Sequence, residues 1–336
     1  MTEFRHQHAG HCESGVTSAL LHHAGLTISE AMVFGLGSGI FFFYPPLVRI
    51  MGFPLISFRA YPGVIFGQAC KRLGVETEAR TYVSQKKGER ELDELLARSV
   101  PVGLRTNMFW LSYFPREFRS QFNGHNLIAL EREGDVYRLS DPVLAEPVSI
   151  DAHALTRSRF AKGVLAPRGG LYYVRSAPSE PDLRPAIRAA VQDTVKRMRA
   201  PLSILGVRGI RRLARHVRGW GTKVADPKRR KLLLGHVVRM QEEVGTGGAG
   251  FRFMYAAFLQ EAGEHLAHQP FLDASQKMTE IGDLWRSGFA LTSARIIKDP
   301  APAGENLGEA AAILEECAAK EEEVFRFLGS HLPAAS

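Results

Sequence analysis

The chain is organised around the segment Gly10-His11-Cys12-Glu13-Ser14-Gly15, which holds the first of its three cysteines. Downstream of it, Val16, Ala19 and Leu20 recur at helical spacing, and this predicts a helix that begins at or just after Cys12. At such a position the unpaired backbone N–H groups and the positive end of the helix dipole favour a thiolate over a thiol. Cys12 is therefore either a packed structural residue or an activated nucleophile.

The composition is that of a chain with a full hydrophobic core. Of its 336 residues 45% are hydrophobic and 23% are charged, and the length predicts two domains. The sequence has no apolar run long enough to span a membrane, and its N-terminus lacks the apolar core of a signal peptide. Three cysteines are too few for a disulfide framework, so we expect a reducing, cytoplasmic location.

The net charge of +8 is concentrated in one region. Residues 175–231 hold sixteen lysines and arginines against four acidic residues, a local excess of +12. Such a block indicates an acidic partner, or it forms the solvated faces of helices. Aromatic residues, on which nucleic-acid bases stack, are nearly absent from it, so we do not expect a nucleic-acid partner.

The two halves of the chain differ in their periodicity. In the first half the pattern predicts helices at residues 62–73 and 89–98 and strands at residues 53–59, 75–83, 100–105, 124–131 and 136–140. The second half predicts six helices, at residues 183–198, 204–217, 228–243, 251–267, 271–297 and 305–328. Prolines near residue 180 mark a boundary between them. We therefore expect an α+β domain with a small antiparallel sheet at residues 1–177 and an all-α domain at residues 178–336.

A histidine and an aspartate stand at the two ends of a predicted β-hairpin. A tight turn that pairs Arg132 with Asp135, or nearly so, brings His125 opposite Asp141 or one residue away. Opposed Cβ atoms lie about 4.5–5.5 Å apart, within reach of an imidazole–carboxylate hydrogen bond. With Cys12 as nucleophile, His125 matches the base and Asp141 the residue that orients it.

Other groups of reactive side chains compete with this triad. A zinc site is one alternative, but four ligands within seven consecutive residues are sterically awkward, and we predict no metal site at His6, His8, His11 and Cys12. Asp151 and His153 lie past the hairpin at a predicted helix start. Cys70 and Cys317 fall within predicted helices, where we expect packed thiols.

Two glycine-rich segments carry further candidates. Residues 35–39 lack the spacing of a dinucleotide-binding motif, so their glycines serve either a substrate contact, at Gly37, or a tight turn. Residues 245–250 precede Arg252 in the first turn of a helix. This second segment is either an anion-binding cradle with Arg252 as its charge, or a close helix crossing in which Arg252 is salt-bridged to a neighbour.

Several of these segments resemble the N-terminal domain of the butirosin-biosynthesis acyltransferase family: Gly10-His11-Cys12, residues 34–39, Gly124-His125-Asn126 and Ser140-Asp141-Pro142. The second half resembles the companion domain of unknown function often fused to it, most specifically at residues 245–255. The resemblance implies a papain-like fold with the order Cys, His, Asp, which is also similar to the cysteine peptidases that trim bacteriocin leaders.

The resemblance implies a cysteine-dependent acyltransferase of secondary metabolism. Cys12 takes the acyl group from an acyl carrier protein thioester, His125 acts as base and Asp141 orients it, and a small-molecule amine accepts the acyl group. No cofactor belongs to the chain itself, since the phosphopantetheine arm arrives on the carrier. A hydrolase or peptidase of the same fold and a non-catalytic carrier-binding module are the alternatives. The oligomeric state stays open.

The chain departs from papain-like enzymes before the cysteine. These enzymes carry an oxyanion-hole glutamine six residues upstream, where this chain has His6, with Gln7 one residue off. The hole then uses the Cys12 backbone N–H with Gln7, His11 or a group that the sequence does not identify. Aromatic residues at 41–44 and 108–114 line an acyl pocket or belong to the core. The substrate-binding candidates are Gln7, His11, Gly37, Tyr44 and Arg252.

An acidic carrier would be attracted by the basic block. We expect it to dock on the helical half, through arginines spaced three and four residues apart so that several share one helix face. These are Arg208, Arg211, Arg212, Arg215 and Arg218.

Overall fold

The structure, a computed structural model, describes residues 4–245, 247–299 and 307–333. They form two compact units. The N-terminal unit comprises the residues up to Val33 and Ile65–Asp182, and the helical unit comprises Phe34–Val64 and the residues from Leu183 onward. The predicted domains 1–177 and 178–336 thus differ from the observed units mainly at residues 34–64, which belong with the helices.

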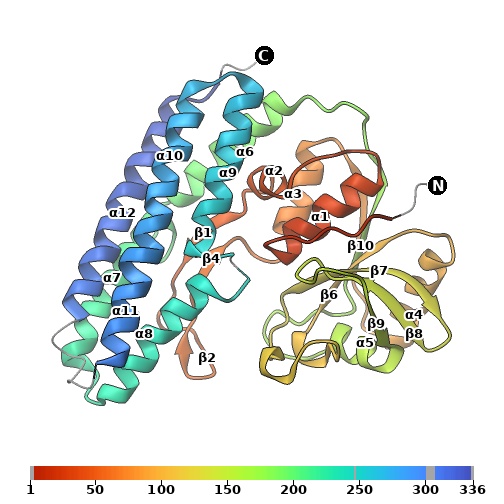
Figure 1. The fold of residues 1–336 in the computed structure, drawn as a ribbon, viewed down its shortest axis with the longest axis horizontal. Helices are drawn as coiled ribbons and strands as arrows, with labels where there is room; N and C mark the ends of the chain where they lie inside the picture. The colour runs from red at the N-terminus through yellow and green to blue at the C-terminus, as the bar shows by residue number, and fades with distance from the viewer. Residues whose placement is uncertain (1–3, 246, 300–306, 334–336) are drawn as a thin grey trace. The chain divides into compact units, whose positions relative to one another are not determined.

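The N-terminal unit is built on one antiparallel sheet with the strand order β5-β10-β6-β7-β8-β9 (Figure 1). Its strands are β5 (Glu76–Arg80), β6 (Val102–Thr106), β7 (His125–Glu133), β8 (Val136–Ser140), β9 (Val148–Asp151) and β10 (Leu171–Ser176). The helices of this unit are α1 (Cys12–His23), α3 (Val64–Arg72), α4 (Gln85–Leu96) and α5 (Ala152–Arg159), and α2 (Glu30–Leu36) runs across the division between the units. The predicted α+β class is confirmed.

The two faces of the sheet are covered by different helices. Leu92 of α4 and Leu155 of α5 share one buried cluster with alternate strand residues such as Leu104 and Leu127. Helix α1 contacts β6, β7 and β10, and its residues are not part of that cluster. Since successive side chains of a strand alternate between faces, β7 can present different residues to α1 and to α4.

The hairpin of β7 and β8 closes with a different pair from the predicted one. Glu133 pairs with Val136, one residue along each strand from the predicted pair of Arg132 with Asp135. The register also shifts along β7, between Ala129 and Glu131. A bulge of this kind cannot be read from alternation, because an extra residue changes which side chains are opposed.

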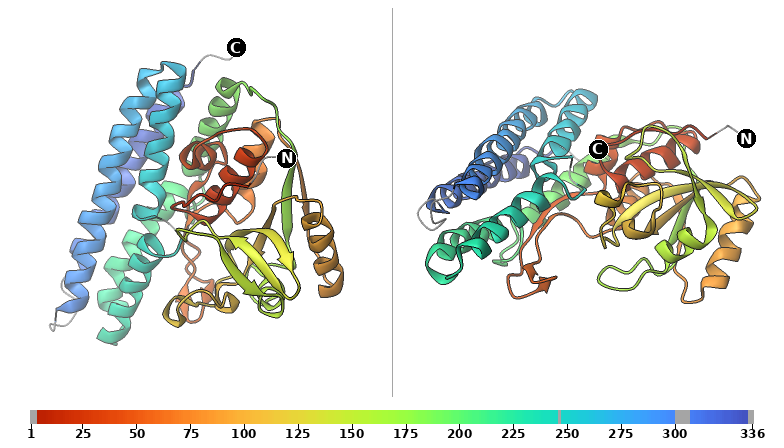
Figure 2. Two further views of the ribbon diagram at one scale, coloured as in Figure 1. Left: turned by 45° about the vertical axis from the view of Figure 1, so that its right-hand side comes forward. Right: turned by 60° about the horizontal axis from the view of Figure 1, so that its bottom comes forward.

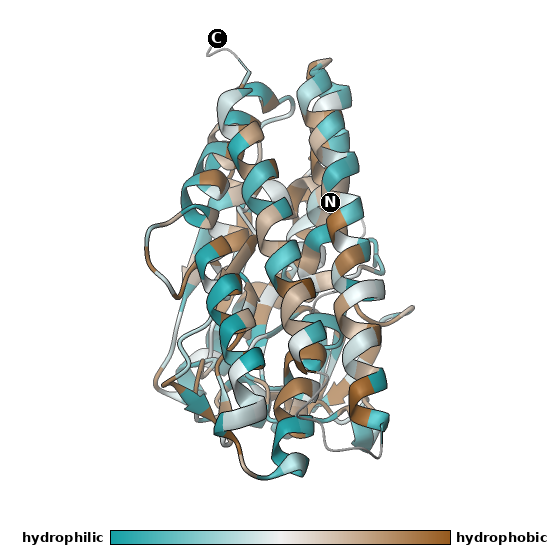
Figure 3. Cartoon of the chain, turned by 90° about the vertical axis from the view of Figure 1, so that its left-hand side faces the viewer, coloured by the Kyte–Doolittle hydropathy of each residue, from teal (hydrophilic) through white to brown (hydrophobic). Residues whose placement is uncertain are grey.

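In the described residues of the helical unit, the six predicted helical segments form seven α-helices. They are α6 (Leu183–Met198), α7 (Gly206–Lys223), α8 (Pro227–Glu242), α9 (Arg252–Leu266), α10 (Gln269–Asp283), α11 (Leu291–Lys298) and α12 (Leu307–Ser330). The π-helical segment Leu284–Ala290 joins α10 to α11 in one rod, as Figures 1 and 2 show, so the prediction of one helix over residues 271–297 holds for its course. Residues 305 and 306 of the last predicted helix lie outside the described residues. Along the helices hydrophilic and hydrophobic segments alternate (Figure 3), as amphipathic helices require.

Residues 34–64 join the helical unit because their aromatic side chains pack into it. They form two antiparallel pairs, β1 (Ile40–Phe43) with β4 (Ser57–Arg59) and β2 (Arg49–Ile50) with β3 (Phe53–Pro54). The ring of Phe58 meets Trp285 edge-on at a centroid distance of 5.5 Å, and Phe34 stacks on Phe251 at 5.2 Å. These partners are more than two hundred residues apart in sequence, so periodicity gives no sign of them.

The sequence predicts that the chain has no membrane span, and the lengths and hydropathy of the described helices can be compared with that prediction. Within the part of the chain that the structure describes, no helix combines the length and the apolar character needed to cross a bilayer.

Candidate active site

The turn before Cys12 is held in place by Glu30. Its carboxylate accepts hydrogen bonds from the backbone N–H groups of Gly10 and His11, at 2.9 and 2.7 Å, and from the Ser14 hydroxyl at 3.0 Å. The imidazole of His11 is the N-cap of α1 and accepts from the Ser14 N–H. Cys12 is thereby fixed as the first residue of the helix, where the helix dipole stabilises negative charge.

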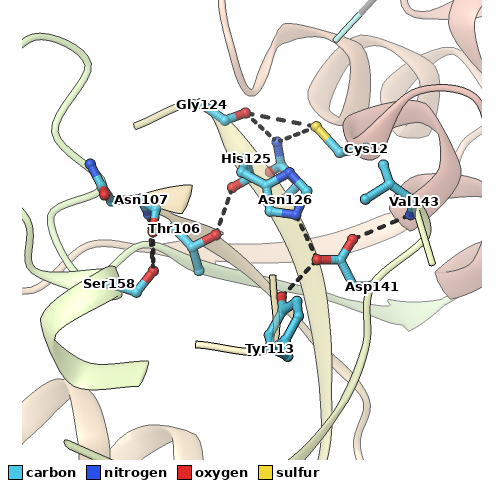
Figure 4. Close-up of polar contacts among 10 residues, drawn as sticks. All are labelled: Cys12, Thr106, Asn107, Tyr113, Gly124, His125, Asn126, Asp141, Val143 and Ser158. Carbon is cyan, nitrogen blue, oxygen red and sulfur yellow. Dashed lines mark hydrogen bonds and ion pairs between the residues drawn. The ribbon is translucent and has the colours of Figure 1, made fainter. Parts of the chain in front are cut away.

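The structure brings Cys12, His125 and Asp141 together (Figure 4). Nε2 of His125 lies 2.7 Å from Oδ2 of Asp141, and the Cys12 sulfur is close enough to the ring to contribute to its raised pKa. Because Asp141 engages Nε2, Nδ1 is the nitrogen left for the sulfur. The residues are 5%, 3% and 0% exposed, in the order Cys12, His125, Asp141. This is the arrangement that base-assisted nucleophilic catalysis requires.

The hairpin places the pair diagonally. Ile128 pairs with Ser140, so His125 lies two residues from the position opposite Asp141, and the predicted offset of at most one residue is wrong. The two residues still share a face of the sheet, because side chains two apart along a strand point the same way. Diagonal neighbours lie about 7–8 Å apart, a gap that an imidazole and a carboxylate span together.

A long aromatic loop between β6 and β7 holds the carboxylate. The hydroxyl of Tyr113 donates to Oδ2 of Asp141 at 2.7 Å, and the N–H of Val143 donates to Oδ1 at 3.3 Å. Phe114 packs edge-on against the His125 ring at a centroid distance of 5.9 Å. Neither role is predicted from the sequence, although the length and the aromatic content of the loop are a signal for a functional segment. Two other aromatic residues of this loop, Phe109 and Trp110, help line a cavity of about 370 Å³.

The charges of the pair stabilise one another. Burial alone lowers the pKa of His125, but the carboxylate of Asp141 and the contact with Cys12 outweigh it and raise the pKa to about 10. Burial acts in the opposite sense on Asp141, and the imidazolium together with the Tyr113 hydroxyl keeps the pKa of that carboxyl below its usual value. At neutral pH the histidine is therefore an imidazolium beside the cysteine, the state that supports a thiolate.

The predicted oxyanion residues before the cysteine have other roles. The side-chain amide of Gln7 donates to Nδ1 of His22 at 2.6 Å, and His11 is the buried N-cap. His6, at the position of the papain-like glutamine, is hydrogen-bonded to Ser140 at 2.7 Å. Gln7 and His11 thus both help to shape the turn before Cys12, and substrate binding by either of them stays a prediction. Among the side chains described, no group of three or more His, Cys, Asp or Glu residues could hold a metal ion.

The remaining predicted binding residues belong to the helical unit. Gly37 lies buried in the turn after α2, where the neighbouring glycines are needed for packing: a Cβ on Gly39 would lie 2.5 Å from the ring of Phe34. Tyr44 is buried, and its hydroxyl oxygen is hydrogen-bonded to Nδ1 of His216 at 2.9 Å. Of the two interpretations of residues 35–39, the structure has the tight turn. Tyr44 belongs to the core.

Arg252 is a buried structural cation. Its Nε and Nη2 donate to the two carboxylate oxygens of Glu321, each at 2.9 Å, and its Nη1 donates to the Gly250 carbonyl at 2.6 Å. The indole of Trp285 also donates to Glu321, at 2.7 Å, and both charged side chains are 0% exposed. The prediction of a substrate-binding arginine is wrong, and the salt-bridged alternative is correct. Of the glycine segment at residues 245–250, residue 246 lies outside the described residues.

Arg252→Met should destabilise the chain by about 3–5 kcal/mol, because it leaves the Glu321 carboxylate buried without its cation. The double variant Arg252→Met/Glu321→Gln should recover part of that loss, since a neutral amide can still accept from Trp285. Urea unfolding measures both. Arg218→Met, which breaks the exposed pair with Glu315, is the matched control and should have a far smaller effect. A single variant no less stable than the double would contradict the buried-charge account.

Comparison with known proteins gives two family matches. The family model described as Butirosin biosynthesis protein H, N-terminal, matches residues 11–142, and the one described as Domain of unknown function (DUF4872) matches residues 153–328. These matches confirm the resemblance predicted from the sequence. No curated protein matches the chain. Among solved structures, the chain is similar to one described as a C39-like peptidase from Bacillus anthracis, at 14% identity and a TM-score of 0.37, over 52% of this chain and 96% of that one.

Proposed function

We propose a function for this chain from its family and its site. The chain belongs to the family of the domain of unknown function DUF4872, because the model of that family covers more than half of the residues of the chain. Fused to that domain is the N-terminal domain of the butirosin biosynthesis protein H type. The proposed function is cysteine-dependent acyl transfer, from the thioester of an acyl carrier protein to a small-molecule amine. The observation that supports it best is the grouping of Cys12, at the start of α1, with the hydrogen-bonded pair of His125 and Asp141.

In the first half-reaction the Cys12 thiolate attacks the thioester carbonyl of the carrier's phosphopantetheine arm. The tetrahedral intermediate expels the arm's sulfur, which takes the proton held by His125, and the acyl group remains on Cys12. In the second half-reaction the amine attacks the acyl-enzyme and gives a proton to His125. Collapse of that intermediate releases the amide and restores the thiolate beside the imidazolium. Asp141 keeps its charge throughout and orients the ring.

A hydrolase or peptidase of the same fold is the second candidate, because water in place of the amine would use the same three residues. Intact mass after incubation with an acylated carrier protein tests the shared first step: the chain should gain the mass of the acyl group. Addition of the amine then separates the two enzymes, since a transferase yields the amide and a hydrolase yields the free acid. A chain that binds the carrier and gains no mass would instead be a non-catalytic binding module.

The arginines of α7 differ in what they contact. Arg211 forms an ion pair with Glu322 of α12, and Arg218 forms one with Glu315 at 2.7 Å. Both contacts hold two helices of the bundle together. We therefore narrow the proposed docking surface for the acidic carrier to the α7 arginines that follow one another at four- and three-residue spacing on a different face, Arg208, Arg212 and Arg215.

The variant Arg208→Glu/Arg215→Glu should lower kcat/KM with an acylated carrier by about tenfold or more, because complementary charge accelerates encounter. It should leave the reaction with a small free thioester unchanged, and the carrier reaction of the wild type should weaken as salt rises. Lys86→Glu/Lys87→Glu, at exposed positions of α4, changes the net charge equally and is the control. Equal losses on both substrates, or no dependence on salt, would refute docking on α7.

A further inference from the structure

The acyl transfer proposed above needs a hydrogen-bond donor for the oxyanion of its tetrahedral intermediates. The two side chains predicted for this purpose are engaged elsewhere, Gln7 with His22 and His11 as the helix cap. A donor has to lie close to the Cys12 sulfur, because the oxygen it stabilises sits on the carbon bonded to that sulfur.

Asn126 supplies such a donor. It follows His125 on β7, so its side chain points to the other face of the strand, the face of the sheet that includes Tyr172. Its Nδ2 lies 3.8 Å from the Cys12 sulfur and 3.2 Å from the Gly124 carbonyl oxygen (Figure 4). The residue is buried, so a charge that develops beside it meets little competing water.

The contacts of the amide fix which of its atoms faces the sulfur. The Gly124 carbonyl can only accept a hydrogen bond, so the amide atom beside it is the nitrogen. On the other side, the hydroxyl of Tyr172 donates to Oδ1 of Asn126 at 2.9 Å. Burial raises the pKa of Tyr172 well above its usual value, which keeps this hydroxyl protonated. One N–H of Nδ2 serves Gly124, and the second is directed to the reacting atoms.

Tyr172 is itself rigidly held. Its ring packs against Phe66 at a centroid distance of 4.5 Å. On the paired strand it lies over Gly103, where a Cβ would come within 2.4 Å of the ring. Glycine at 103 is thus required by the tyrosine, and the tyrosine hydroxyl is aimed at the amide.

We propose that Asn126 is a further catalytic residue, whose side-chain N–H stabilises the oxyanion formed on the acyl group at Cys12, and that Tyr172 is the positioning residue that orients its amide. This assignment rests on the proposed acyl transfer for its substrate. Attack forms the bond from sulfur to the carbonyl carbon and moves the carbonyl π electrons to oxygen. The N–H of Asn126 binds that oxygen until the leaving group departs and the carbonyl re-forms.

Two reactions of Cys12 separate this role from a structural one. Acylation by a p-nitrophenyl ester passes through an oxyanion, whereas alkylation by iodoacetamide is a displacement at saturated carbon and does not. Asn126→Ala should slow acylation by about 10²–10³-fold, the usual cost of losing one oxyanion donor. Its alkylation rate should stay within about threefold of the wild type.

Tyr172→Phe keeps the ring and removes only the hydroxyl, so it should slow acylation by about tenfold and leave alkylation unchanged. Tyr173→Phe, at the next position of the same strand, is the matched control and should alter neither rate. Equal losses in acylation and alkylation, or normal acylation in Asn126→Ala, would overturn the assignment. The Tyr172→Phe result decides the matter if Asn126→Ala does not fold.

The ester assay needs neither carrier nor amine, so it separates this assignment from the proposed function. A wild type that ignores carrier thioesters, while its acylation by the ester depends on Asn126, would refute the carrier as donor and leave Asn126 as the oxyanion residue. A wild type that neither the ester nor a carrier thioester can acylate would overturn both.

Discussion

Cys12→Ala should abolish acyl-enzyme formation, with no mass added to the chain after prolonged incubation with an acylated carrier. The Cys12 sulfur is the atom that holds the acyl group in the proposed acyl-enzyme, so no partial activity is expected. We expect this thiol to be reactive because Cys12 is the first residue of α1 and lies beside a protonated His125. Intact mass spectrometry measures the result directly.

The other two cysteines are the controls. Burial raises the pKa of Cys70 to about 12, and it raises the pKa of Cys317 well above its usual value. Both therefore remain thiols at neutral pH and pack as small apolar side chains. Cys70→Ala should keep nearly full acyl-enzyme formation. An adduct that survives in Cys12→Ala and disappears in Cys70→Ala would show that Cys70, and not Cys12, is the nucleophile.

The sequence predicts those parts of the site that depend on local signals. A glycine and a cysteine before a helical pattern place Cys12 at the start of α1. Alternation and a tight turn place His125 and Asp141 at the same end of a hairpin. These features depend on residues a few positions apart, and for that reason they are readable without a structure.

The parts that were predicted wrongly depend on long-range packing. Arg252 stands in a glycine-rich helix start typical of an anion site, and only the partner Glu321, in the last helix, reveals the buried ion pair. The packing of residues 34–64 into the helical unit is set by aromatic contacts across the sequence, such as that of Phe58 with Trp285. The amide of Asn126 acquires its orientation from Tyr172, on another strand.

His125→Ala should lower turnover by about 10⁴-fold or more, since it removes both the proton carrier and the cation that supports the thiolate. Asp141→Asn should cost less. An asparagine can still accept from the His125 ring, as the papain-like Cys-His-Asn variant of the triad does. It cannot, however, satisfy all three donors that now meet the carboxylate, which come from His125, Tyr113 and Val143. Single-turnover acylation rates measure both losses.

The pH dependence gives Asp141→Asn a second readout. In the wild type the pKa of His125 is raised from 6.5 to about 10. The folded chain thus binds a proton that the unfolded chain releases above pH 6.5, and this contribution to stability is complete below 6.5 and lost as pH rises to about 10.

Asp141→Asn removes the main cause of the raised pKa while the burial that lowers it remains, so the pKa of His125 should fall. The alkaline limit of acylation should then move to lower pH, and stability should depend less on pH between 6.5 and 10. His125→Gln, which is uncharged at every pH, is the reference for the stability measurement. An alkaline limit that is the same in the wild type and in Asp141→Asn would show that Asp141 does not hold the proton on His125.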